Sequence, residues 1–398
     1  MSGHWRNWSG SVAFAPQRIA QPRDVDEIAA LVRDVRQRGG TLRAIGSGHS
    51  SSHAILACDD TLLSLRHLRG IVSVDRGANE ATVYAGSTLD DLGRALYEHD
   101  LALPNYGDVA TQTIGGAIAT GTHGTGPRLC NLSQLLIAAT LVDGCGKVRH
   151  ISREQVDDLR AARVALGALG VFATLTLRLV PTFDVERREY AIATDAALAQ
   201  LDALVAGNRS LDFYWYPRRD DIKLRLVNAS GGGTAPDDAR LLTRHSGAGH
   251  IVIPTHTGIP HRFEECEYAL PAEQGMACFR ALRQRVLQRW RHVVGWRVLY
   301  RTLAADDADL SPAHGRDTVT ISLHQNSTLP WRDYFADIEP LFRAHGGRPH
   351  WAKKHSLRTA ELAPLYPRWQ AFARVRRAFD PDGVFLTAPL RELLEVTA

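Results

Sequence analysis

The sequence predicts an α+β protein with two domains. Its 398 residues are too many for one ordinary hydrophobic core. The first 180 residues alternate helix and strand patterns, whereas longer strand patterns follow Pro181. This change of character predicts a mixed first domain and then a mainly antiparallel sheet with helices on one face.

The first half contains two clear helix patterns. Residues 24–38 repeat apolar side chains at helical spacing and end at Gly39-Gly40. A second helix is expected after Ser87, with Ser87 as its cap and Asp90 as the capping-box partner. Strand patterns cover residues 41–45, 81–85, 135–142, 147–151 and 171–180, the last of which Pro181 ends.

The second half has its own set of strands and one long helix. Strands are expected at residues 213–216, 222–227, 297–303 and 318–324. The basic stretch 280–292 carries apolar side chains at helical spacing and predicts an amphipathic helix with a solvated arginine face. Residues 230–236 predict an exposed loop. From about His350 the chain returns to helix, and a short apolar strand is expected at residues 384–386.

Composition narrows the class of protein. A net charge of +4 is small for this length and argues against nucleic acid as a partner. The five cysteines are scattered and form no C-x-x-C pair, which favours reduced thiols and no disulfide framework. The N-terminal residues lack a signal-peptide pattern, and no apolar run is long enough to span a bilayer. We therefore expect a cytoplasmic protein with no membrane partner.

The first candidate site is the sequence GSGHSSS at residues 46–52, directly after a strand. Glycines let a backbone approach a ligand closely, and successive N–H groups form an anion-binding nest. The loop lacks the third glycine and the clear following helix of a Rossmann motif, and it lacks the lysine of a Walker loop. It predicts a diphosphate cradle, with a plain structural turn as an equal alternative.

The second candidate is GGAIATGTHGTG at residues 115–126, whose glycine content is not typical of an ordinary helix or strand. Each of the two loops has a central histidine, and about 75 residues separate them. Together they predict one extended ligand held from two sides. The alternative is a glycine-rich packing corner.

With its motifs in this order, the chain resembles the vanillyl-alcohol oxidase superfamily of FAD enzymes. The resemblance rests on the strand followed by GSGHSSS, on NYGDVATQTIGG at residues 105–116, and on ATGTHGTG at residues 119–126. RNWSG at residues 6–10 and RPHWAK at residues 348–353 are similar to its aldonolactone oxidase and alditol oxidase branch. The resemblance implies a bipartite FAD-binding domain of the PCMH type with an inserted antiparallel-sheet cap domain. We place the FAD-binding domain at residues 1–180, the cap at 181–349, and a returning segment at 350–398.

The resemblance also implies FAD bound covalently through His49. Residues 107–113 contain no cysteine, so a single covalent link is expected. A small residue at Gly107 is implied to admit molecular oxygen to the flavin, where alanine favours a dehydrogenase. The implied cofactor-binding residues are Arg43, Ile45, Gly46, Ser47, Gly48, His49, Ser50, Gly107, Asp108, Thr111, Gly115, Gly116, Thr120, Gly121, His123, Gly170 and His350.

A third constellation lies in the second half. By resemblance, Arg301 on its strand and Lys353 in HWAK are catalytic cations that stabilise negative charge on a reduced flavin. Ser322 and His324 alternate on one strand face, which is implied to face substrate, with His324 as a candidate base.

Two positions depart from the branch's pattern and put its usual substrates in doubt. Leu299 stands where the relatives have a glutamate that binds substrate hydroxyls, and Asp108 stands where alditol oxidase has a serine.

The implied activity is oxidation of a hydroxyl on a sugar-like alcohol, of the alditol or aldonolactone type, with hydride transfer to flavin N5 and release of hydrogen peroxide. A nucleoside oxidase is the alternative, since Leu299 and the aromatic residues Phe213, Tyr214, Trp215, Tyr216 and Trp296 favour a bulkier, flat substrate. A dehydrogenase with another electron acceptor also remains open. The seventeen histidines make a metal hydrolase another alternative to consider. However, the sequence contains no zincin motif, and no metal is expected. A non-catalytic FAD- or sugar-binding module is the last alternative.

Overall fold

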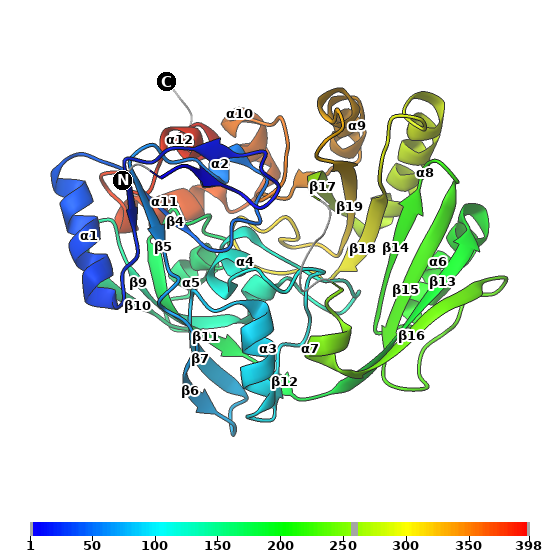
Figure 1. Cartoon of the computed structure of the whole chain (residues 1–398), viewed down its shortest axis with the longest axis horizontal. Coiled ribbons are helices and arrows are strands. Elements are labelled where there is room, and N and C mark those ends of the chain that lie inside the picture. The colour runs from blue at the N-terminus through cyan, green and yellow to red at the C-terminus, as the bar shows by residue number, and fades with distance from the viewer. Residues whose placement is uncertain (1–2, 256–261, 396–398) are drawn as a thin grey trace.

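The computed structural model describes residues 3–255 and 262–395, arranged as two sheet-containing halves side by side (Figure 1). The N-terminal half holds a five-stranded antiparallel sheet in the order β10-β9-β11-β7-β6 and a three-stranded parallel sheet in the order β3-β5-β4. Their strands are β3 Arg18–Ala20, β4 Leu42–Ile45, β5 Thr61–Ser64, β6 Ile71–Asp75, β7 Glu80–Tyr84, β9 Leu136–Val142, β10 Val148–Ile151 and β11 Val171–Arg178. Two short pairs accompany them: β1 Trp5–Arg6 with β2 Ala13–Phe14, and β8 Leu101–Ala102 with β12 Val180–Pro181.

Helices cover this half and link its sheets. They are α1 Val25–Gln37, α2 His53–Leu56, α3 Leu89–Tyr97, α4 Ile114–Thr120 and α5 Val156–Ala162, with a 3-10 turn at Leu132–Leu135. The predicted helix at residues 24–38 is confirmed, and Asp24 caps it by accepting a hydrogen bond from the Glu27 N–H.

The second half is built on an eight-stranded sheet in the order β16-β13-β15-β14-β18-β19-β17-β20, in which every neighbouring pair is antiparallel. The strands are β13 Asp184–Ala193, β14 Ser210–Tyr216, β15 Asp221–Asn228, β16 Arg240–Ala248, β17 Phe263–Pro271, β18 Val298–Leu303, β19 Thr318–Asn326 and β20 Arg348–Pro349. Its helices are α6 Thr194–Ala206, α7 Gly249–Val252, α8 Ala272–Arg289 and α9 Arg332–Ala344. The predicted antiparallel sheet is confirmed, and it is wider than the four expected strands.

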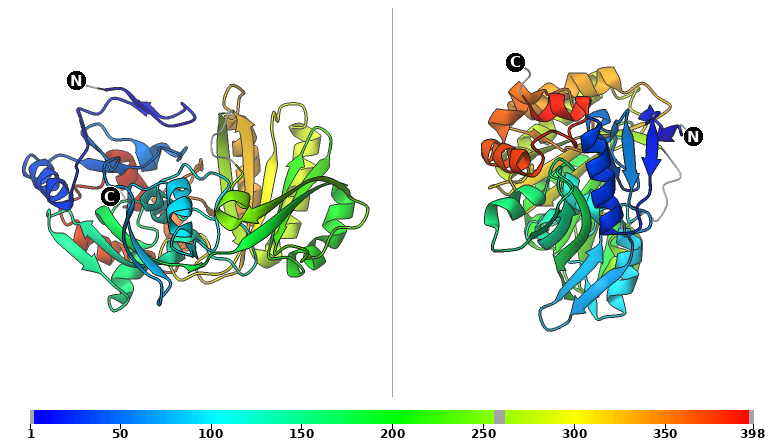
Figure 2. Two further views of the ribbon diagram at one scale, coloured as in Figure 1. Left: turned by 60° about the horizontal axis from the view of Figure 1, so that its bottom comes forward. Right: turned by 90° about the vertical axis from the view of Figure 1, so that its left-hand side faces the viewer.

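The two faces of this sheet differ in chemistry because side chains alternate along each strand. On one face, Phe213 and Tyr300 stack on each other and pack against Phe279 of α8. Tyr268 of β17 stacks on Phe342 of α9 on that same side. The helices therefore cover an apolar face, and the opposite, polar face points towards the N-terminal half (Figures 1 and 2).

The C-terminal segment returns to the N-terminal half, where α11 Trp369–Phe379 packs on α5 and α12 Ala388–Leu394 packs on α2. Before them come α10 Thr359–Leu362 and a 3-10 turn at Ala363–Leu365. The strand predicted at residues 384–386 is wrong. Val384 contributes a single backbone bond to Leu42 of β4, while the Asp380 carboxylate accepts the N–H groups of Val384 and Phe385 and holds them out of a ladder.

Two local predictions are also corrected. Thr88, not Ser87, caps α3, because its hydroxyl accepts the Asp91 N–H, while the Ser87 hydroxyl bonds to backbone at Gly70 and Tyr84. The glycine-rich stretch from residue 115 begins inside the short helix α4, despite its composition.

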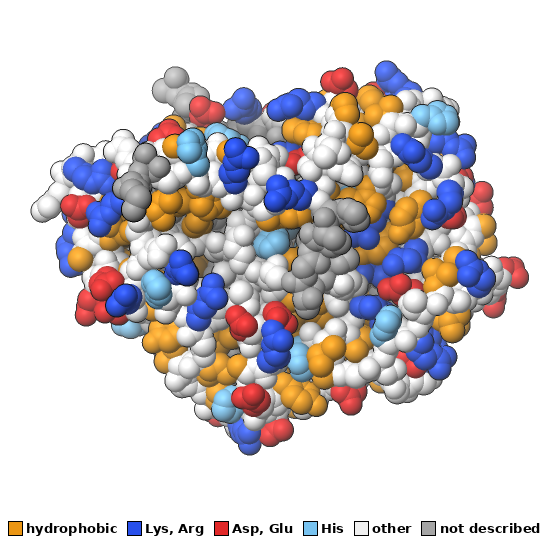
Figure 3. All heavy atoms as spheres, viewed as in Figure 1, with side chains coloured by type: hydrophobic (Ala, Val, Ile, Leu, Met, Phe, Trp, Pro, Cys, Tyr) orange, Lys and Arg blue, Asp and Glu red, His pale blue; other side chains and the backbone are white. Residues whose placement is uncertain are grey.

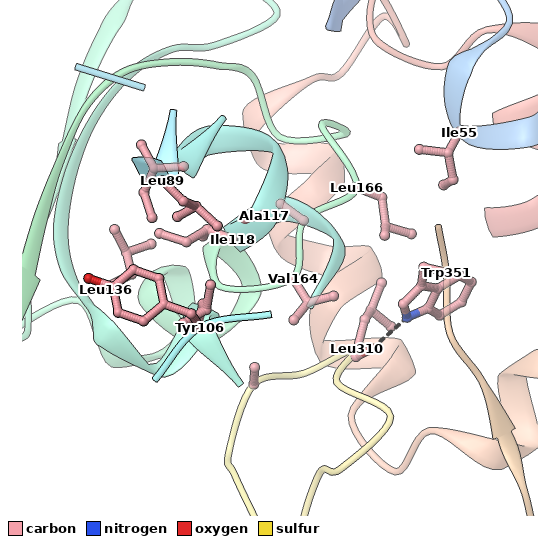
Figure 4. Close-up of a cluster of buried hydrophobic side chains, with 14 of the residues drawn as sticks. Ile55, Leu89, Tyr106, Ala117, Ile118, Leu136, Val164, Leu166, Leu310 and Trp351 are labelled. Carbon is pink, nitrogen blue, oxygen red and sulfur yellow. Dashed lines mark hydrogen bonds between the residues drawn. The ribbon is translucent and has the colours of Figure 1, made fainter. Parts of the chain in front are cut away.

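Tertiary packing explains this short helix. Ala117 and Ile118 project from α4 into a cluster that includes Leu89 and Leu136 (Figure 4). Burial of these apolar side chains outweighs the unfavourable helix propensity of the two glycines.

The surface carries mixed charge. Basic and acidic side chains are interspersed over the face in Figure 3. All five cysteines are free thiols, as predicted. Within the described ranges, no helix combines the length and the apolar character needed to cross a membrane.

Candidate active site

A cavity lies between the glycine-rich loops of the N-terminal half and the polar face of the large sheet. One wall comes from the two predicted loops and from β4, and the other from β17, β18, β19 and the HWAK segment. The predicted site residues that line it are Arg43, Ile45, Gly46, Ser47, Gly48, His49, Ser50, Gly107, Asp108, Gly115, Gly116, Thr120, His123, Gly170, Leu299, Arg301, His324, His350 and Lys353. Three others, Thr111, Gly121 and Ser322, do not line it.

The His49 loop is held by contacts from both sides. The Ser47 hydroxyl donates to the Thr111 carbonyl at 2.5 Å, and the Thr111 hydroxyl lies 2.8 Å from His49 Nε2. On the other side, the Trp8 indole N–H donates to the His49 carbonyl at 3.1 Å and its ring packs on the imidazole. Gly48 has φ +69°, and a Cβ there would lie 2.9 Å from the Trp5 ring, so the loop requires glycine at this position.

His49 is poised as a neutral imidazole. Burial, together with the nearby charge of Lys353, lowers the pKa of His49 to about 4. At neutral pH its ring therefore carries one proton and one free lone pair, which is the form that acts as a nucleophile.

Arg43 brings an unpaired positive charge to the cavity. Its side chain is buried, and its Nε and Nη1 atoms have no hydrogen-bond partner within residues 3–255 and 262–395. Burial lowers the pKa of Arg43 to about 10, which leaves the group charged at neutral pH. A buried cation without a protein partner calls for an anionic ligand.

The sheet wall is built by rows of facing residues across β18, β19 and β17. In one row, Leu299 of β18 lies opposite Ser322 of β19, which lies opposite Glu267 of β17. Leu299 and Glu267 line the cavity, whereas Ser322 does not. In the neighbouring row His324 faces Glu265. The register therefore brings two carboxylates from β17 into the same wall as the predicted residues.

Arg301 sits in a buried network of alternating charge. It contacts Asp108 at 2.7 Å and Asp212 at 3.4 Å, and Arg225 bridges the same two carboxylates. The Tyr214 hydroxyl also donates to Asp108, at 2.8 Å. Burial opposes charge in these groups, but Arg225, Arg301 and Arg297 together hold the pKa of Asp108 well below its usual value. Asp108 thus anchors Arg301 from the opposite half of the molecule.

Lys353 and His324 share the Glu265 carboxylate. The Lys353 ammonium contacts Glu265 Oε2, and His324 Nε2 lies 3.4 Å from Glu265 Oε1. Burial lowers the pKa of His324 to about 4, so this imidazole is neutral at neutral pH. Its Nδ1 atom has no hydrogen-bond partner in the part of the chain that the structure describes. This group presents a carboxylate, an ammonium and a neutral imidazole together, a set suited to binding hydroxyl groups.

Glu267 organises a second buried group. Its Oε1 atom lies 2.7 Å from His123 Nε2, while His123 Nδ1 contacts the Gly124 carbonyl at 2.8 Å. The His123 ring thus lies between a carboxylate and a backbone carbonyl. The ligand atoms of His123, Glu267 and His350 lie within 4.8 Å of one another. His350 Nδ1 accepts the Ala352 N–H at 3.2 Å.

Comparison with known proteins assigns the chain to a family. The profile of an FAD binding domain matches residues 16–152, and that of D-arabinono-1,4-lactone oxidase matches residues 255–393. The L-gulono-1,4-lactone dehydrogenase of Mycobacterium tuberculosis is 35% identical over 99% of this chain and 100% of its own length. The chain belongs to the aldonolactone and alditol oxidoreductases. It is thus an FAD-dependent oxidoreductase of the vanillyl-alcohol oxidase superfamily.

Other members of the family are similar over their whole length. The alditol oxidase of a Streptomyces species is 30% identical over 99% of this chain and all of its own. Mouse L-gulonolactone oxidase is 28% identical over 98% of both chains. Among solved structures, cholesterol oxidase from B. sterolicum has a TM-score of 0.86 at 16% identity, covering 98% of this chain and 96% of its own, which shows a shared fold.

The cavity fits the FAD of this family. FAD carries an anionic diphosphate, and the buried, unpaired guanidinium of Arg43 offers it a partner. The chain runs so close to this guanidinium that a Cβ on Gly167 would lie 2.9 Å from Arg43 Nη1. The glycine loops at Gly46–Gly48 and Gly115-Gly116 bring bare backbone to the same cavity.

In this oxidoreductase, the aromatic residues that the sequence suggested for stacking on a flat substrate do not lie at the cavity. Phe213 and Trp215 pack against Phe279 of α8, on the face of the sheet away from the cavity. Tyr214 donates a hydrogen bond to Asp108 and does not line the cavity. Trp296 packs on Phe263 and His324.

The largest omission from the sequence-based site is the pair Glu265 and Glu267. Both are buried and line the cavity of the oxidoreductase, yet β17 was not among the predicted strands. The sequence FEECEYALP at residues 263–271 does contain a usable signal. Acidic residues at 265 and 267 alternate with Cys266 and Tyr268, as expected for a strand with one polar and one apolar face.

Proposed function

We propose that this chain oxidises a hydroxyl group of a small polyhydroxylated substrate, an aldonolactone or an alditol. The observation that carries the proposal is the cavity itself, in which a glycine-lined wall faces a wall of ionic and hydroxyl-binding side chains. FAD supplies the hydride acceptor at N5, and molecular oxygen takes the electrons and leaves as hydrogen peroxide.

The proposed roles follow from the contacts. Arg301 and Lys353 stabilise the negative charge that develops on the flavin as it accepts hydride from the substrate. Glu265 and the neutral His324 bind substrate hydroxyls, and either one accepts the hydroxyl proton. Two buried carboxylates on β17 compensate for the glutamate that Leu299 replaces. Because these groups are polar, a small polyol or lactone suits the wall better than a nucleoside.

We further propose a division of labour along the chain. Residues 1–180 and 350–398 form the FAD-binding domain, and residues 181–349 form the cap that binds substrate. The return of α11 and α12 to α5 and α2 supports this arrangement, as does the sheet made of residues 184–349. A screen of xylitol, L-gulono-1,4-lactone and adenosine for peroxide release tests the activity, and a preference for adenosine would contradict the assignment.

The first prediction is that FAD stays attached to the protein after denaturation. The neutral His49 lines the cavity and has a free lone pair to bond the flavin. Protein precipitated in acid should remain yellow and fluoresce on a denaturing gel, and His49→Ala should release its flavin. A wild-type protein that loses its colour under these conditions would refute covalent attachment.

The second prediction concerns the electron acceptor. A Cβ at Gly107 would lie 3.3 Å from the His123 carbonyl oxygen, so alanine fits after a small shift while it narrows the cavity wall. We expect Gly107→Ala to slow reoxidation of the reduced enzyme by oxygen about tenfold, equivalent to about 1.4 kcal/mol in the barrier. Stopped-flow mixing with aerated buffer measures this rate. Slow reoxidation of the wild type itself, alongside rapid reduction of a dye, would identify a dehydrogenase.

A further inference from the structure

Thr111 is a predicted cofactor residue that does not line the cavity. Its hydroxyl instead lies 2.8 Å from His49 Nε2. Its backbone carbonyl accepts the Ser47 hydroxyl, so the residue joins the two glycine-rich segments at two points. The contacts of Thr111 are therefore with the His49 loop and its imidazole.

The contact distinguishes the two nitrogens of the imidazole. Nε2 is engaged by Thr111, whereas no hydrogen bond reaches Nδ1 from residues 3–255 or 262–395. When the Thr111 oxygen accepts the Nε2 proton, the neutral ring keeps its lone pair on Nδ1. The nitrogen that is free to form a bond is then Nδ1.

We propose that Thr111 positions His49 for covalent attachment of FAD by holding its tautomer, so that Nδ1 bonds to the 8-methyl carbon of the flavin. This inference rests on the covalent link in the proposed function. Burial supports it, since a partly buried imidazole with a pKa of about 4 stays neutral across the physiological range.

A hydroxyl at this position suits the imidazole both before and after attachment. Before the bond forms, Nε2 carries a proton and Thr111 accepts it. Once Nδ1 is alkylated, the neutral ring keeps only a lone pair on Nε2, and the same hydroxyl rotates to donate. A hydroxyl is both donor and acceptor and serves both states without any movement of the backbone.

The step balances as a two-electron oxidation of the methyl carbon. The new bond joins Nδ1 to that carbon, and one C–H bond of the methyl group breaks. Its electron pair, its proton and the proton lost from Nε2 pass to the isoalloxazine ring, and molecular oxygen then accepts two electrons and two protons as hydrogen peroxide.

The experiment compares wild type with Thr111→Val, which keeps the shape and removes the hydroxyl, and with Thr111→Ser, which keeps the hydroxyl. Each full-length protein is incubated with FAD, and samples are withdrawn over time into acid. The flavin that remains on the precipitate and the intact mass report attachment, while the native absorbance reports bound FAD. We expect T111V to bind FAD and attach it at least about tenfold more slowly, with T111S close to wild type.

The outcomes separate this inference from the function on which it rests. Release of all flavin from the wild type would refute the covalent link itself. If the wild type retains flavin and T111V attaches it at the same rate, the role of Thr111 is refuted and the link stands. A T111V protein that binds no FAD at all would assign Thr111 to cofactor binding and also refute the positioning role.

Discussion

Replacing Arg301 by alanine is expected to slow reduction of the flavin by substrate about a hundredfold or more. The guanidinium is buried at the cavity and held at 2.7 Å by Asp108, so it offers charge that needs no reorganisation during the reaction. Loss of one such preorganised donor costs about a hundredfold to a thousandfold in rate. Anaerobic stopped-flow mixing with L-gulono-1,4-lactone or xylitol, followed at the flavin absorbance, measures the effect.

The control for this prediction is FAD content, which should remain that of the wild type because Arg301 belongs to the sheet wall and not to the glycine loops. Arg301→Lys should recover part of the rate, since a lysine keeps the charge but loses the fork that contacts two carboxylates. Lys353→Ala should slow the same step. If both alanine variants reduced the flavin at wild-type rates, the proposed role of Arg301 and Lys353 in flavin reduction would be wrong.

Replacing Arg225 by alanine is expected to destabilise the protein by about 3–5 kcal/mol, the cost of removing one partner from a buried ion pair. Arg225 is buried between Asp108 and Asp212, which would be left with Arg301 as their nearest cation. Attraction to these carboxylates outweighs burial and raises the pKa of Arg225 well above its usual value. Urea unfolding at pH 7.5 measures the free energy of unfolding.

Arg358 offers a matched control for Arg225. It pairs with Glu392 at 3.1 Å, but both side chains are mostly exposed. Solvent screens such a pair, so Arg358→Ala should leave the unfolding midpoint unchanged. If Arg225→Ala and Arg358→Ala lowered the free energy of unfolding equally, burial of the Arg225 ion pairs would not be the source of their stabilising effect.

Much of the fold was predictable because its signals are local. Residues 24–38 carry their own apolar stripe and cap, and β19 carries its own alternation of faces. The predictions failed where a local pattern met a competing contact. Residues 384–386 are apolar, yet Asp380 binds the N–H groups that a strand would use. Likewise, α4 forms around two glycines because its other side chains are buried.

The sequence by itself indicated the two glycine-rich loops that line one side of the cavity. The GSGHSSS and GTHGTG segments are short, and their glycine content permits the close approach of backbone to a ligand. Arg301 and Lys353 were found through the order of motifs, and both line the cavity.

Only the tertiary structure decided which charges these residues meet. His123 pairs with Glu267 across 144 residues, and Arg225 pairs with Asp108 across 117. Such pairs depend on the strand order of the large sheet and on its register, because a shift of one residue would turn each side chain to the opposite face. Register is set by packing over the whole sheet, so a local pattern can indicate the strand β17 but not the residues that its carboxylates meet.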